Sequence, residues 1–88
     1  MSRYEAGMFV KSKAGHDIGK IYVIIRTEGE YLYLADGNLR TLDKLKKKNQ
    51  KHVQVIHRKC DMQNITDIYI KKVLKDYNKE IAVIKEGK

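Results

Sequence analysis

The chain has 88 residues, of which 42% are hydrophobic and 34% charged, and its formal net charge is +8. A core this small is nearly all used for folding and leaves little room for a buried active site, so we expect a binding protein and not an enzyme. Residues 1–5 lack the apolar stretch of a signal peptide, and the longest apolar run, residues 21–25, is far too short for a membrane span. The single cysteine, Cys60, cannot form an internal disulfide. These features predict a cytoplasmic protein that does not associate with a membrane.

The positive charge is concentrated in the middle of the chain. Residues 1–39 carry five basic groups against five acidic ones, and residues 60–88 carry six against five. Residues 40–59 carry eight basic groups against Asp43 alone, a local balance of +7. A lysine loop kept for solubility is the alternative explanation, but solubility does not require clustering, whereas a polyanion would relieve the self-repulsion of such a cluster. The pattern therefore favours nucleic-acid binding by Arg40, Lys44, Lys46, Lys47, Lys48, Lys51, Arg58 and Lys59.

Residues 7–42 are typical of short β-strands separated by glycine turns, because β-branched and aromatic residues dominate each run. We expect strands at 8–13 and 21–25, joined by a loop at 14–19 that contains Gly15 and Gly19. Leu32 and Leu34 alternate with two tyrosines, which places the leucines in the core and the tyrosines outside or at the barrel edge. The sequence predicts a small all-β barrel.

The dipeptide Asp36-Gly37 is a strong hairpin signal, and residues 38–42 are the expected returning strand. Residues 43–51 are too polar for the core, so we expect them to form an exposed loop that carries the lysines. The next expected strand is 52–56, where Val53 and Val55 alternate with polar residues.

Beyond residue 64 the apolar residues recur every three or four positions, as on one face of a helix. Thr66 or Asn64 can cap its start, and Asp67 suits the first turn. We expect this helix to brace the barrel with its lysines largely toward solvent, although its apolar face could instead dock a protein partner. The apolar positions are Ile65, Ile68, Tyr69, Val73, Leu74, Tyr77 and Ile81.

The segment 8–25, MFVKSKAGHDIGKIYVII, resembles the KOW motif, and Gly19 matches the invariant glycine of that motif. Residues 34–42, LADGNLRTL, and 46–54, KKKNQKHVQ, are similar to small bacterial KOW-domain RNA-binding proteins related to one large-subunit ribosomal protein group of archaea and eukaryotes. The resemblance departs at Leu45, where these relatives lead us to expect proline.

This resemblance implies a mainly β fold, a small SH3-like KOW barrel of about five strands with a C-terminal α-helix. The implied organisation is an N-terminal tail at 1–6, the barrel at 7–58 and a helical extension at 59–88. It also implies binding to RNA, as rRNA or on the ribosome, by the Gly19 loop and the basic segment through phosphates and shape. The preference for RNA over DNA comes from the resemblance and not from the charge. Besides the eight basic residues above, the expected RNA-binding residues are Lys11, Lys13, Gly19, Lys20 and His52.

Two other classes of function are alternatives to RNA binding. A protein-interaction KOW barrel would use Tyr31, Tyr33 or the helix to contact a transcription or ribosomal partner. Metal binding by His52, His57 and Cys60 is disfavoured because no paired ligand spacing is present, and we expect no metal, no cofactor and no catalytic residue.

Overall fold

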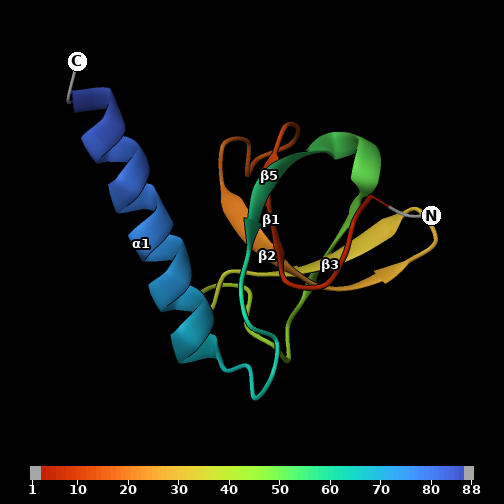
Figure 1. Ribbon diagram of the computed structural model, residues 1–88. Coiled ribbons are helices and arrows are strands. Elements are labelled where there is room, and N and C mark those ends of the chain that lie inside the picture. Colours follow the sequence, from red (N-terminus) through yellow and green to blue (C-terminus); the bar gives the residue numbers. More distant parts are fainter. Residues whose placement is uncertain (1–2, 87–88) are drawn as a thin grey trace.

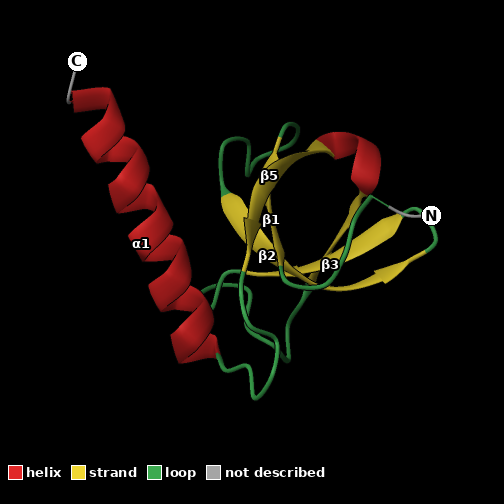
Figure 2. Cartoon of the chain, in the orientation of Figure 1, coloured by secondary structure: helices red, strands yellow, loops and turns green. Residues whose placement is uncertain are grey.

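The computed structural model describes residues 3–86, which form one five-stranded antiparallel sheet and one long helix (Figures 1 and 2). The elements are β1 (Met8–Ser12), β2 (Ile21–Glu28), β3 (Tyr31–Ala35), β4 (Lys46–Asn49), β5 (Val53–Lys59) and α1 (Asp67–Glu86), with a 3-10 turn at Gln50–His52 between β4 and β5. The expected mainly β fold with a C-terminal helix is confirmed at this level. Residues 1–2 of the expected tail and 87–88 of the expected extension lie outside the described residues.

The strand order is β4-β3-β2-β1-β5, so the sheet is open and β4 and β5 are its edges. The sheet curls strongly around an interior, and α1 lies against its outer side (Figure 1). Both faces are therefore buried in the part of the sheet that α1 covers. Consecutive side chains of β1 and β2 alternate between them, which explains why residues 8–10 and 21–25 are apolar without interruption. The interior cluster consists of Val10, Tyr22, Ile24, Leu32, Leu34 and Val53, and the cluster under the helix consists of Phe9, Val23, Ala35, Ile70 and Leu74.

The helix begins as the sequence predicts. The backbone N–H of Tyr69 donates to the Thr66 hydroxyl at 3.1 Å, which satisfies one free donor of the first turn. Ile70 and Leu74 are buried against the sheet, and the Tyr77 ring packs edge-on against Phe9 with centroids 5.6 Å apart. The brace role of the helix is confirmed. Ile68 was wrongly placed on the apolar face, since it is 83% exposed.

The predicted hairpin at Asp36-Gly37 and the strand at 38–42 are wrong. The Asp36 carboxylate accepts the N–H groups of Asn38 at 2.9 Å and Arg40 at 2.8 Å, which folds the chain into a compact loop. Gly37 has a φ of +77°, and a Cβ atom there would lie 2.4 Å from the Asp67 carbonyl oxygen of α1. This glycine therefore serves a close approach to the helix and not a tight hairpin turn.

Candidate nucleic-acid interface

Within the predicted loop at 43–51, residues 46–49 form the strand β4 and not a loop. β4 pairs with β3, and its alternation turns Lys46 and Lys48 toward the Asp17 carboxylate while Lys47 faces outward over the Tyr31 ring. Charged side chains that point inward from an edge strand also discourage pairing with another chain. The polarity of residues 46–49 thus has a structural reason within the fold.

Asp17 holds this edge strand to the β1–β2 loop. Its carboxylate accepts hydrogen bonds from Ser12 Oγ at 2.8 Å, Tyr22 OH at 2.9 Å and Lys48 Nζ at 3.1 Å, and Lys46 Nζ lies 3.6 Å away. The side chains of Asp17 and Lys48 are each only 11% exposed. Lys48 and Lys46 are therefore engaged within the protein, most tightly Lys48.

The same contacts set the ionisation of the cluster. Burial alone would raise the pKa of Asp17, but hydrogen bonds from Ser12, Lys48 and Tyr22 and the charge of Lys46 outweigh it, so this pKa lies well below its ordinary value. Burial and the bond to Asp17 raise the pKa of Tyr22. At neutral pH Asp17 is therefore a carboxylate and Tyr22 a neutral phenol.

Lys20 Nζ lies 3.9 Å from Asp36 Oδ2, and Arg40 lies in the loop that Asp36 organises. Most of the other predicted residues fall into two groups. Arg58 forms an ion pair with Glu80 of α1, and Lys59 pairs with Glu5 at 3.0 Å. The second group is exposed and forms no ion pair with the described residues. It consists of Lys11 and Lys13 near the start of the Gly19 loop, of Lys44 and Lys47, and of Lys51 and His52 in the 3-10 turn. The Lys13 N–H donates to the His52 carbonyl at 2.8 Å, which brings the Gly19 loop and the basic segment together at one end of the sheet.

The β1–β2 loop and the loop after β3 form a groove with α1, which we call the lysine groove. It encloses about 690 Å³. Gly19 at its edge has a φ of +88°, as its turn position predicts, and a Cβ there would meet nothing within 4 Å. The lining consists of Gly19, Lys20, Ile21, Asp36 and Asn38 from the sheet and loops, and of Lys71, Leu74, Lys75, Asn78, Lys79 and Ala82 from α1.

The helix lysines of this groove were not among the predicted site residues, because the acidic residues of α1 dilute them in the sequence. The structure separates the two charges. Lys71, Lys75 and Lys79, spaced four apart, share the groove side, whereas Asp76 and Glu80 line a smaller pocket of about 220 Å³ on the other side of α1. Spacing of four residues was the available signal for a common face. What that face meets depends on the tertiary fold.

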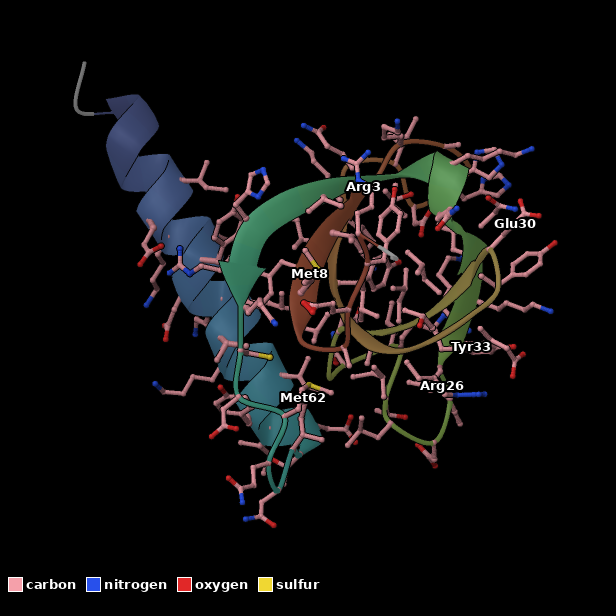
Figure 3. The ribbon with its side chains drawn as sticks, turned by 45° about the vertical axis from the view of Figure 1, so that its right-hand side comes forward. Arg3, Met8, Arg26, Glu30, Tyr33 and Met62 are labelled. Carbon is pink, nitrogen blue, oxygen red and sulfur yellow. The ribbon has the colours of Figure 1, made fainter. Side chains whose placement is uncertain are left out.

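A second exposed surface lies on the side of the sheet away from α1, where Figure 3 labels Arg26 and Tyr33. The Arg26 guanidinium lies 3.8 Å from the Tyr33 ring centroid, and Lys47 Nζ lies 4.4 Å from that of Tyr31. Neither ring belongs to a core cluster, and Tyr31 is 42% exposed. Both tyrosines face outward, as the alternation predicts, and the leucines between them are buried.

No protein-family model and no curated protein matches the chain. Among the residues that the structure describes, no three His, Cys, Asp or Glu side chains gather as a metal site. The described helix is not long and apolar enough to cross a membrane. Burial raises the pKa of the Cys60 thiol.

Proposed function

We propose that this chain binds structured RNA, as rRNA or a ribosome-associated RNA, and that the lysine groove is the principal contact. The observation that carries the proposal is that Lys20, Lys71, Lys75 and Lys79 line one groove beside Gly19. Within the described residues, the three helix lysines have no ion pair, so their charge is available to phosphates. Binding of this kind is driven largely by phosphate contacts and counterion release.

The resemblance to KOW proteins is the reason for proposing RNA over DNA, and for proposing rRNA or the ribosome as the binding partner. Five antiparallel strands, a glycine with positive φ in the β1–β2 loop and a basic surface beside that loop support an SH3-like KOW barrel. We propose that the groove reads backbone and shape, since double-stranded RNA is recognised mostly by its shape and by contacts to its 2′-hydroxyls and phosphates. Lys11, Lys13, Lys51 and His52 extend the basic surface at the same end of the sheet.

Two triple variants test which lysines bind. Changing Lys71, Lys75 and Lys79 to glutamine should weaken binding to rRNA fragments at least about tenfold and reduce the slope of log K against log salt by about 2. The matched variant changes Lys44, Lys47 and Lys51, which removes the same charge from the basic segment. A larger loss in the second variant would place the site on residues 40–59 and refute the groove assignment. Crosslinking followed by sequencing would identify the RNA, and crosslinks concentrated on one rRNA helix support a ribosomal role.

The exposed tyrosine surface favours a second candidate, a protein-interaction barrel that contacts a transcription or ribosomal partner. Exposed aromatic side chains are enriched at the centres of protein interfaces. This function predicts little RNA affinity at physiological salt and co-purification of a protein partner after nuclease treatment. Replacing Tyr31 and Tyr33 with serine should then abolish the co-purification, whereas the glutamine variants of the groove should not.

A further inference from the structure

Asp36 is a carboxylate inside a groove otherwise lined by lysines, asparagines and apolar residues. Its side chain is 13% exposed, and its Oδ2 lies 3.9 Å from Lys20 Nζ. A carboxylate at this place repels phosphate and lowers the affinity of the groove for any polyanion. The loop uses only one oxygen of this carboxylate, because the N–H groups of Asn38 and Arg40 both donate to Oδ1.

The other oxygen is left as an acceptor. Lys20 at 3.9 Å is beyond hydrogen-bond distance, and no other described donor bonds to Oδ2. A group that hydrogen-bonds there must be a donor without negative charge. Along a nucleic-acid strand the phosphates are separated by sugars, and the ribose 2′-hydroxyl is such a donor.

The position of Asp36 fits this alternation. Its neighbour Gly37 lies against α1, since a Cβ there would be 2.7 Å from the Lys71 backbone nitrogen. Asp36 therefore lies at the Lys71 end of the groove, and Lys75 and Lys79 continue away from it at about 6 Å per step along the helix. A strand whose phosphates meet these lysines can present a sugar to Asp36.

We infer that Asp36 makes the lysine groove selective for RNA over DNA, by accepting a hydrogen bond from a ribose 2′-hydroxyl at Oδ2. This inference rests on the proposed RNA binding. With DNA the carboxylate repels the strand without any compensating bond. A hydrogen bond to a charged group that one polymer makes and the other lacks corresponds to about a tenfold difference in affinity.

The variant Asp36→Asn tests the acceptor with little change of shape. An asparagine keeps an oxygen for the N–H groups of Asn38 and Arg40 and presents an NH₂ donor in place of Oδ2. The probes are one RNA hairpin, the same hairpin with 2′-fluoro sugars, and the DNA hairpin of the same sequence. The 2′-fluoro strand keeps the charge and sugar conformation of RNA but has no 2′ donor. Wild type should bind the RNA about tenfold more tightly than the 2′-fluoro hairpin, and Asp36→Asn should reduce this ratio to about twofold or less.

Asp76→Asn is the matched control, because it removes the same charge from the opposite side of α1. Asp76→Asn should leave the ratio of RNA to 2′-fluoro affinity unchanged. If Asp36 acts only through its charge, Asp36→Asn should instead strengthen binding of all three hairpins equally. Single 2′-fluoro substitutions, measured on wild type, need no variant and should identify a sugar whose hydroxyl matters. RNA binding with no such sugar, or with an unchanged ratio in Asp36→Asn, overturns the inference and leaves the proposed function standing. Absence of RNA binding by wild type overturns both.

Discussion

Replacing Asp17 with asparagine removes the charge at the centre of the cluster that joins β4 to the β1–β2 loop. Asparagine keeps the size and one carbonyl oxygen, so part of the bonding to Ser12 and Tyr22 survives. The main loss is the charged bond to Lys48, whose side chain is 11% exposed and retains the Ala14 carbonyl at 2.9 Å.

The magnitude follows from these contacts. A hydrogen bond between charged groups contributes about 1.5–3 kcal/mol, and the longer and more exposed contact to Lys46 adds less than about 1 kcal/mol. We therefore expect Asp17→Asn to lower the free energy of unfolding by about 3 kcal/mol at pH 7. For a domain of this size, this corresponds to a fall in Tm of roughly 12–24 °C.

Urea unfolding followed by far-ultraviolet circular dichroism measures this loss, with an unchanged m-value as the sign that the unfolded state is unaffected. Lys48→Met and the double variant complete a cycle, in which we expect a coupling of about 2 kcal/mol between Asp17 and Lys48. A loss below about 1 kcal/mol, or additive single variants, would refute the view that this pair secures the edge strand.

The pH dependence gives an independent check. The pKa of Asp17 is lower in the folded protein than its ordinary value of 3.8, so the unfolded chain binds more protons as the pH falls below that value. The stabilisation is complete above about pH 5 and is lost progressively as the pH falls through about 4 toward the folded pKa. The difference between wild type and Asp17→Asn should therefore shrink below pH 4, and a constant difference would contradict the linkage.

Three further predictions use matched pairs or single atoms. Gly37→Ala should lower the free energy of unfolding by more than about 3 kcal/mol, because the added Cβ would overlap the α1 backbone. Gly19→Ala should lower it by only about 1–2 kcal/mol, because the added Cβ would lie in open space and only the positive φ is strained. Equal losses in urea unfolding would contradict this difference. Lys75→Gln should weaken RNA binding several-fold, because Lys75 lines the groove. Lys72→Gln should change RNA binding little, because Lys72 lies outside the groove and pairs with Asp76. Filter binding at two salt concentrations compares the two variants. Tyr22→Phe should lower the free energy of unfolding by about 1 kcal/mol through loss of the hydroxyl bond, and no change in the urea midpoint would refute it.

Local patterns predicted the elements whose cause is local. Residues 8–13 and 21–25 were recognised because β-branched and aromatic runs favour strands, and the helix was recognised from its apolar period and from the Thr66 cap. The prediction of a hairpin at Asp36-Gly37 was wrong because the same dipeptide fits both a tight hairpin turn and the compact loop that packs on α1. Which one forms depends on the Asp67 backbone, some thirty residues further along the chain.

The β4 strand could not be predicted for a similar reason. Nothing in three consecutive lysines favours a strand, and residues 46–49 become one through pairing with β3 and through the distant Asp17 carboxylate. The lysines of α1 are expected from the sequence to lie largely toward solvent, and their spacing of four residues puts Lys71, Lys75 and Lys79 on one face. That this face borders the Gly19 loop follows only from the packing of the helix on the sheet.

Folding also redistributes the charge that the sequence concentrates in residues 40–59. Four of the eight basic groups there form ion pairs within the described residues, and each pair reaches another part of the chain: Lys46 and Lys48 to Asp17, Arg58 to Glu80, and Lys59 to Glu5. The C-terminal third, nearly neutral in sequence, places Lys71, Lys75 and Lys79, which form no ion pair with the residues that the structure describes, on one side of a helix. A polyanion responds to the field of the folded surface and not to the charge of a segment. The lysine groove is for this reason a stronger candidate for the RNA-binding site than residues 40–59 alone, and the two triple variants decide between them.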